Sequence, residues 1–289
     1  MSTVMIGYGR PAYGQLRSAV AERKRADPLA TVTVLVPANL AGVHVRRALA
    51  HGFGAHPGVA GLIVSTVDRL AERIAAPALA GSGRRPVTEP VLAAAWRRAL
   101  AGDPGTFRPV HEHPSTVRAL VHAHRELREV DDAGLDAIAS AGAVAEDLVR
   151  LHRRVTALLR DDYWYDQTDL RRLARPDPEL GAVVSFLLRD LPPSAEGFLD
   201  RLPDLARIEG IDREARPGTV FDASDADDEV RCLVRRLAVT LRGTPAHRIA
   251  CCTGPISRTR VWSPSIWTRP ASAGTDSACS PPSSAGRRG

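Results

Sequence analysis

The sequence predicts an α/β fold with a parallel sheet, interrupted by an all-helical insertion. Short apolar segments alternate with helical segments over residues 1–80, and this alternation is typical of β-α-β units and a parallel sheet. From Thr88 to about Arg160 only helical periodicity is present, and a strand pattern resumes near Ala182. These two observations indicate a block of helices inserted into an α/β domain.

Three strands are predicted near the start of the chain, at 3–6, 31–36 and 61–65. We expect the first to be short and buried, and the second to be buried on both faces because it is β-branched and apolar throughout. Helices are expected after these strands, over 15–24, over 40–51 with Asn39 as N-cap, and onward from Ser65 or Thr66. The predicted apolar face of the second helix comprises Leu40, Val43, Ala48 and Leu49.

A glycine-rich segment lies between the first strand and the first helix. Four residues separate Gly9 from Gly14, which is the spacing of a P-loop, and a glycine loop before a helix places N–H groups around a phosphate. A working P-loop continues with Lys, which reaches the phosphates, and Ser or Thr, which ligates Mg²⁺; here Gln15 and Leu16 follow. We interpret Gly9, Gly14 and Gln15 as a vestigial phosphate loop, with ATP and Mg²⁺ binding at most vestigial and no cofactor expected. An ordinary βα turn and a surviving ATPase are the alternatives.

The helical block is predicted to contain four helices, over 88–101, 114–130, 132–140 and 143–161. Thr88, Ser115 and Asp131 are the expected starts of the first three. The chain beyond the block is predicted to form a helix over 169–174, a strand over 182–188, a helix over 194–206, a strand over 219–223, a helix over 225–242 and a strand from His247. The helix over 225–242 has acidic residues in its first turn, which suits the helix dipole.

The net charge of +6 does not by itself indicate a nucleic-acid partner, because residues 251–289 hold five arginines and one aspartate. The rest of the chain is therefore nearly balanced in charge. No apolar run reaches the roughly 20 residues of a membrane span, and the N-terminus lacks the pattern of a signal peptide. We expect a cytoplasmic protein with no membrane partner.

Residues 251–289 differ from the rest of the chain, since they contain no leucine, eight serines and five prolines. A strand that begins at His247 should continue with apolar residues, but Cys251, Cys252 and Thr253 follow Ala250. Our hypothesis is that this tail is an out-of-frame translation of a GC-rich gene. The alternative is a genuine disordered tail, and either origin predicts poor packing.

Several stretches occur in an order and spacing that resemble one protein family. They are the glycine loop at 9–16, Val-Leu-Val-Pro-Ala-Asn at 34–39, Ser-Thr-Val-Asp-Arg-Leu-Ala at 65–71, Tyr-Asp-Gln-Thr-Asp-Leu at 165–170, and 227–231 followed by 247–250. Together they resemble the N-terminal part of AddB-type proteins, the inactivated helicase-like subunits of AddAB helicase–nucleases. These are long, often actinobacterial proteins of the RecB-family exonucleases with a PD-(D/E)XK nuclease domain. The resemblance covers about residues 3–250.

The resemblance implies an α/β core of the superfamily 1 helicase type. On this reading the helicase-like core covers 1–80 and 165–224, the helical insertion 85–162, and the start of a second helicase-like half 225–250, before the tail at 251–289. A nuclease site of the PD-(D/E)XK type is excluded for this chain. Lys24 is the only lysine, and no aspartate precedes it.

The resemblance also implies double-strand-break repair, with DNA as a partner, single-stranded or as duplex ends, and a UvrD- or AddA-like helicase subunit. We expect a helicase-like, non-catalytic DNA-binding scaffold of a helicase–nuclease complex, with no catalytic residue of its own. A truncated or frameshifted pseudogene product without stable function is the alternative, and a small-molecule kinase would need a lysine that the glycine loop lacks.

The candidate DNA-binding residues are Tyr163, Trp164, Tyr165 and Arg69. Aromatic rings can stack on single-stranded bases, and the alternative for the three aromatics is a plug that closes the helical block. No metal ligand is expected. The histidines at 111, 113, 122 and 124 could suggest a metal site, but residues two apart on a helix point to different faces, so His122 and His124 would not share an ion. We expect these four histidines to be solvated.

Overall fold

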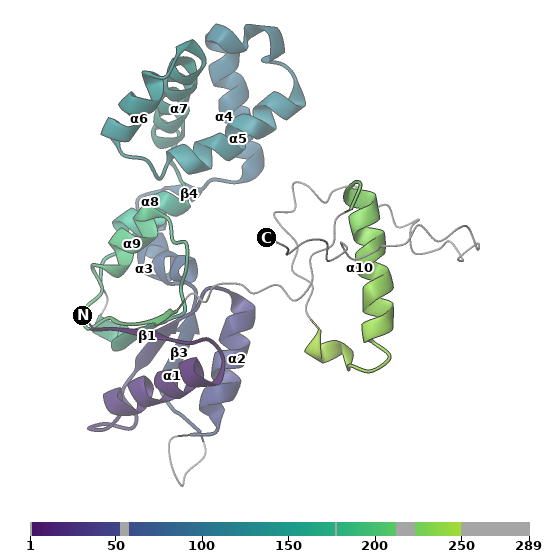
Figure 1. The fold of residues 1–289 in the computed structure, drawn as a ribbon. Helices are drawn as coiled ribbons and strands as arrows, with labels where there is room; N and C mark the ends of the chain where they lie inside the picture. The colour runs from purple at the N-terminus through teal and green to yellow at the C-terminus, as the bar shows by residue number, and fades with distance from the viewer. Residues whose placement is uncertain (1, 53–57, 177, 212–222, 250–289) are drawn as a thin grey trace, which may run out of the picture. The chain divides into compact units, whose positions relative to one another are not determined.

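The computed structural model describes residues 2–52, 58–176, 178–211 and 223–249. The chain divides into two compact units, residues 1–212 and 213–289, and each is described by itself. The first unit contains a five-stranded sheet, the helices that cover it and a block of helices (Figure 1).

The sheet of the first unit is parallel throughout, which confirms the predicted α/β class. Its strands are β1 (Ser2–Ile6), β2 (Val32–Leu35), β3 (Leu62–Ser65), β6 (Ala182–Phe186) and β7 (Ala206–Gly210). Their order is β1-β7-β6-β2-β3, with every neighbouring pair parallel. The two strands that follow the helical block therefore lie between β1 and β2.

Strand β2 is the best-covered strand, and its predicted burial on both faces is confirmed. All four of its residues are buried, and Val34 pairs in register with Val64 on one side and Val184 on the other. The prediction that the first strand is buried is wrong. Strand β1 lies at an edge of the sheet among the described residues, and Val4 and Met5 are 37% and 55% exposed.

Strand β7 was not predicted from the sequence. The predicted helix over 194–206 is shorter, since α9 covers Pro193–Leu199, and the chain then turns into β7 at Ala206. Strand β7 has the sequence Ala-Arg-Ile-Glu-Gly, which contains few residues with high strand propensity. Its position between β1 and β6 stabilises it. The strand predicted at 219–223 falls, except for its last residue, outside the described residues.

Two helices cover one face of the sheet, α1 (Arg10–Arg23) and α2 (Asn39–Ala50). They bury Leu16, Val20, Val45 and Leu49 against alternate residues of β2, β6 and β7. The predicted apolar face of α2 is partly wrong, because Leu40 is 69% exposed whereas Gly42, Val45 and Leu49 are buried. Gly42 packs closely on the sheet, since a Cβ at this position would lie 3.3 Å from Val64 Cγ1, a tight contact.

Lys24 ends α1 and is the only lysine of the chain. It is 6% exposed, and its ammonium group donates hydrogen bonds to the carbonyl oxygens of Pro28, at 3.4 Å, and Ala30. These contacts tie the end of α1 to the loop that leads into β2.

Three helices cover the other face of the sheet, α3 (Val67–Gly81), α8 (Gln167–Leu173) and α9. The side chain of Thr66 caps α3, as one of the two predicted caps. A short 3₁₀ helix, η2 (Pro178–Leu180), leads into β6. The buried residues of this layer include Leu70, Leu170 and Phe198, packed against Leu35 and Val183 of the sheet.

The helical block lies between α3 and α8 in the sequence, and its four predicted helices are confirmed within a few residues. They are α4 (Glu89–Gly102), α5 (Pro114–Leu127), α6 (Asp132–Ala139) and α7 (Ala143–Asp161), with a 3₁₀ helix, η1 (Gly105–Val110), between the first two (Figure 1). Asp131 caps α6 as predicted, whereas α5 begins one residue before the expected Ser115, at Pro114 after the N-cap His113. The block has its own core around Trp96, Leu120 and Leu151.

The two ends of the block are joined by a short parallel ladder between β4 (Arg85–Pro86) and β5 (Trp164–Tyr165). The chain therefore leaves the α/β layers and returns to them at one place.

The second unit contains α10 (Ala226–Thr240) and a 3₁₀ helix, η3 (Ala246–Arg248). Asp225 caps α10 by accepting a hydrogen bond from the N–H of Asp228 at 2.8 Å. The strand predicted from His247 is wrong over the described residues, because η3 occupies its start. The remainder of that prediction, and the tail at 251–289, lie outside the described residues.

Candidate functional site

The glycine segment does not form the expected phosphate loop. Helix α1 begins at Arg10, so the predicted helix start at Gln15 is wrong, and only Gly7, Tyr8 and Gly9 connect β1 to the helix. Gly9 is the N-cap, with a φ of 84°, while Gly14 and Gln15 lie inside α1. These three candidate residues therefore do not share one loop, and the segment has the geometry of the ordinary βα turn.

The three aromatic candidates at the end of the helical block have different surroundings. Tyr163 is 61% exposed and has a φ of 61°. Trp164 is half-buried, and the guanidinium carbon of Arg85 lies 4.3 Å from its ring centroid. Tyr165 is 7% exposed and belongs to the core that α3, α8 and α9 form on the sheet. Trp164 packs against the apolar core of the helical block, as the plug alternative expects, whereas Tyr165 lies in the core of the α/β layers. Tyr163 is the aromatic candidate that is exposed for stacking.

Arg69 lies on α3 and is exposed. Its backbone N–H donates to the side chain of the N-cap Thr66 at 3.3 Å. Trp164 and Tyr165 line a cavity at the base of the helical block, described below, and Arg69 does not line it. The structure therefore does not bring Arg69 together with these aromatic candidates there.

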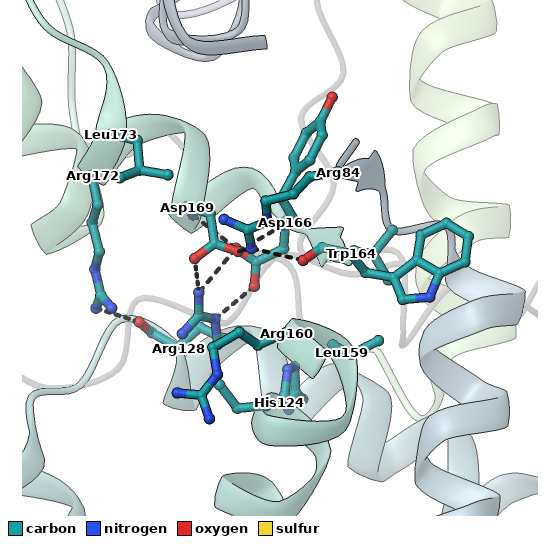
Figure 2. Close-up of a pocket in the computed structure, with 13 residues that line it drawn as sticks. Arg84, His124, Arg128, Leu159, Arg160, Trp164, Asp166, Asp169, Arg172 and Leu173 are labelled. Carbon is teal, nitrogen blue, oxygen red and sulfur yellow. Dashed lines mark hydrogen bonds and ion pairs between the residues drawn. The ribbon is translucent and has the colours of Figure 1, made fainter. Parts of the chain in front are cut away.

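A cavity of about 350 Å³ lies at the base of the helical block. We call it the basal cavity. The end of α5, α7, β5 and α8 enclose it, and its charged lining consists of Arg84, Arg128, Arg160, Arg172, Asp166 and Asp169 (Figure 2). Val87, Leu159, Trp164 and Leu173 contribute apolar walls. Four guanidinium groups therefore face two carboxylates around one cavity.

Arg128, at the end of α5, binds both carboxylates (Figure 2). Its Nε donates to Asp166 Oδ2 at 2.6 Å, and its Nη2 donates to Asp169 Oδ1 at 2.6 Å. Asp166 is the N-cap of α8 and forms a capping box with Asp169, so the helix start fixes both acceptors. Burial alone would raise the pKa of Asp166, but the hydrogen bonds and charge of Arg128 outweigh it and lower that pKa.

Glu129 follows Arg128 and makes a second set of contacts with α8 and α9. It accepts hydrogen bonds from Thr168 Oγ1 at 2.9 Å, Arg171 Nη1 at 3.0 Å and the N–H of Ser194 at 2.9 Å. A second cavity, of about 450 Å³, adjoins this cluster and shares Arg128 and Asp166 with the basal cavity. The two consecutive residues thus join the helical block to the α/β layers through charged hydrogen bonds.

A buried histidine pair lies beside the basal cavity. His124 Nδ1 is 3.0 Å from His152 Nδ1, and the two rings are 2% and 3% exposed. His124 also lines the cavity, and its Nε2 has no hydrogen-bond partner among the described residues. Burial and then the charge of His152 lower the pKa of His124 to about 3, and burial and then the charge of Arg128 lower that of His152 to about 4.

The expectation that the histidines at 111, 113, 122 and 124 are solvated is therefore wrong for His124. His122 is exposed, so the two do lie on different faces of α5, as predicted. The signal that could have located His124 is its spacing, because it continues the apolar stripe of Val117, Leu120 and Val121 at i+3 and i+4. Among the described residues, no group of three or more His, Cys, Asp or Glu side chains could hold a metal ion.

No helix within the described ranges is long and apolar enough to cross a membrane. No protein-family model matches this chain, and a search of curated proteins finds no match. The geometry of the basal cavity, together with the neighbouring Tyr163, is therefore the basis for a functional proposal.

Proposed function

We propose that this chain is a helicase-like, non-catalytic scaffold that binds DNA in a helicase–nuclease complex of double-strand-break repair. The observation that carries the proposal is the basal cavity, in which four arginines meet Trp164, next in sequence to the exposed Tyr163. Arginines attract the phosphates of DNA, and aromatic side chains stack on unpaired bases. Single-stranded DNA or the end of a duplex fits this combination of groups.

The sequence supports a role without catalysis. Gln15 and Leu16 stand where an ATPase would have its lysine and its Mg²⁺-binding hydroxyl, and both lie inside α1. A UvrD- or AddA-like helicase subunit would then supply the motor, while this chain holds DNA. The parallel sheet with its helical block is compatible with the superfamily 1 helicase-like core that the sequence resemblance implies.

The test is DNA binding by the 289-residue protein, measured by fluorescence anisotropy with a tailed duplex at about 50 and about 200 mM salt. We expect binding that weakens as salt is raised, because phosphate contacts release counterions. Tyr163→Ala should raise Kd about tenfold, since stacking on one base contributes about 1–3 kcal/mol.

Two control variants match this change. Tyr8→Ala removes an aromatic side chain that is 43% exposed in the turn before α1, and Arg118→Gln removes an exposed arginine of α5 that does not line the basal cavity. Neither should change Kd more than about twofold. Absence of DNA binding by a folded protein would refute the proposal and favour a product that retains the fold without this function.

A further inference from the structure

We propose that the basal cavity binds a phosphate monoester, either the phosphorylated end of a nucleic-acid strand or a free nucleotide. The strand-end source rests on the proposed function, whereas phosphate recognition itself rests only on the cavity. The ligand would place its phosphate among the arginines and its base or sugar against the apolar wall.

The arginines of the cavity have hydrogen-bond donors to spare. Arg84 Nη2 donates to the carbonyl oxygen of Trp164 at 2.8 Å, and Arg172 Nη2 donates to that of Arg128 at 2.7 Å. A guanidinium has five N–H donors, so each keeps several for a ligand. Arg172 has no carboxylate partner among the described residues, and the ion pair of Arg84 with Asp169 is long, at 3.7 Å. Arg172 therefore carries charge that no carboxylate among the described residues neutralises, and Arg84 is only weakly paired.

The two carboxylates of the cavity do not oppose an anion as strongly as their number suggests. Arg128 binds both Asp166 and Asp169, and Arg84 forms a longer ion pair with Asp169, so these two arginines together offset the two carboxylates. Arg160 adds a further positive charge, and its only ion-pair partner among the described residues is Asp161, at 3.5 Å in an exposed position. The lining as a whole has a net positive charge of two with His124 neutral. This balance favours a phosphate over a cation or a neutral ligand.

The size and the walls of the cavity restrict the rest of the ligand. A volume of about 350 Å³ lies at the lower end of small-molecule sites, which suits a single nucleotide unit, such as the last nucleotide of a strand, rather than the double helix itself. Trp164 and Leu159 give the cavity a partly apolar wall, against which a base can pack. A terminal nucleotide satisfies both limits, whereas inorganic phosphate would leave this wall uncovered.

His124 lies beside the cavity and offers a way to detect a bound anion. Its ring lines the cavity, and its Nδ1 is engaged by His152 at 3.0 Å, so its Nε2 is the ring nitrogen without a partner. If Nδ1 accepts from His152, the neutral ring of His124 carries its proton on Nε2. We therefore expect an anion in the cavity to favour this tautomer and to shift the Nε2 nitrogen resonance of His124.

The experiment compares ligands that differ only in the phosphate group, with the 289-residue protein. Isothermal titration calorimetry measures adenosine 5′-monophosphate against adenosine. Anisotropy measures one single-stranded oligonucleotide in its 5′-phosphorylated, 3′-phosphorylated and unphosphorylated forms. We expect the phosphorylated member of at least one comparison to bind about tenfold or more tightly, the size expected for a charged hydrogen bond.

Arg160→Gln is the first variant, because the side chain is 74% exposed and its removal leaves the contacts of Arg128 intact. We expect it to reduce the preference for the phosphorylated ligand about tenfold while the unphosphorylated ligand keeps its affinity. Arg118→Gln, with an exposed arginine on the same block but away from the cavity, should leave the preference unchanged.

The outcomes separate the two proposals. A preference shown by the mononucleotide indicates a free nucleotide, and a preference shown only by the oligonucleotide indicates a strand end. Equal affinities in both comparisons overturn the phosphate site, and if DNA binding still depends on Tyr163, the DNA-binding proposal stands. A nucleotide preference without any DNA binding would leave the phosphate site and remove the proposed function.

Discussion

Arg128 contributes to stability mainly by keeping two partly buried carboxylates paired. Its side chain is 12% exposed, and those of Asp166 and Asp169 are 19% and 26% exposed. We expect Arg128→Met to lower the free energy of unfolding by about 2–3 kcal/mol, because removal of the arginine leaves two partly buried carboxylates without their main partner. Urea denaturation of the protein measures this difference.

Arg98 provides the control for Arg128. It forms an ion pair with Asp162 at 3.4 Å, but the two side chains are 67% and 57% exposed. Arg98→Met should therefore cost less than about 1 kcal/mol. Similar losses in both variants would contradict the argument from burial, and Asp166→Asn with Asp169→Asn should reduce the loss in Arg128→Met.

The histidine pair predicts that stability falls as the medium becomes mildly acidic. The pKa values of His124 and His152 in the folded chain are about 3 and about 4, below the ordinary value of 6.5. Below pH 6.5 the unfolded chain therefore binds protons that the folded chain does not, and stability is lost as pH falls from 6.5 toward these lower values. Each histidine contributes a slope that rises toward about 1.4 kcal/mol per pH unit as the histidine of the unfolded chain becomes fully protonated.

The measurement is the free energy of unfolding between about pH 5 and about pH 6.5, above the range in which carboxylates titrate. Replacement of both histidines by glutamine should flatten the dependence, whereas His51→Gln, at an exposed position, should not. An unchanged slope in the double variant would show that other groups take up the protons.

At the scale of elements, the sequence predicts those helices and strands that local interactions stabilise, and misses those that depend on neighbouring strands. The four helices of the block were predicted closely because apolar periodicity and caps such as Asp131 mark them. Strand β7 was missed because its neighbours β1 and β6, not its own residues, stabilise it. The early start of α1 was missed because Gly14 suggested a loop, although a helix tolerates one glycine.

Gly61 illustrates a constraint at the start of a strand. It precedes β3 with a φ of 60°, and a Cβ there would lie 2.6 Å from the carbonyl oxygen of Leu29. We expect Gly61→Ala to lower the free energy of unfolding by about 3 kcal/mol, because the cost of backbone strain and the cost of steric overlap add together. Gly83→Ala is the matched control, because its φ is 78° but no atom lies within 4 Å of the added carbon. Gly83→Ala should lower the free energy of unfolding, measured by urea denaturation, by about 1 kcal/mol.

At the scale of the first unit, the helical block and the α/β layers have separate apolar cores. Trp96 is fully buried among Leu92, Leu120 and Leu151, with no residue of the sheet in that cluster. We expect Trp96→Ala to destabilise the block by about 3–5 kcal/mol and to reduce the amide protection of α4, α5 and α7. Hydrogen exchange measured by mass spectrometry should leave β2 and β6 protected as before.

The matched variant in the α/β layers is Phe198→Ala, since Phe198 is fully buried in the core between the sheet and α9. It should reduce protection in the sheet first. Equal loss of protection throughout residues 2–211 in both variants would mean that the charged contacts of Arg128 and Glu129 couple the two cores into one cooperative unit.

The basal cavity shows why the candidate site was predicted only in part. The sequence drew attention to Tyr163, Trp164 and Tyr165 because aromatic side chains can stack on single-stranded bases. The arginines of the cavity come from segments that are far apart in the sequence, and nothing local distinguishes Arg84 or Arg172 from the other arginines. Only the tertiary fold brings them together.

The burial of Lys24 has a practical consequence for chemical labelling. Because the chain has no other lysine, reagents that acylate amines find no exposed lysine side chain on the folded protein. Lys24 can react only when the end of α1 opens from the loop at Pro28 and Ala30. The rate of its acylation is therefore a built-in reporter of local opening in this part of the α/β layers, and it needs no engineered probe.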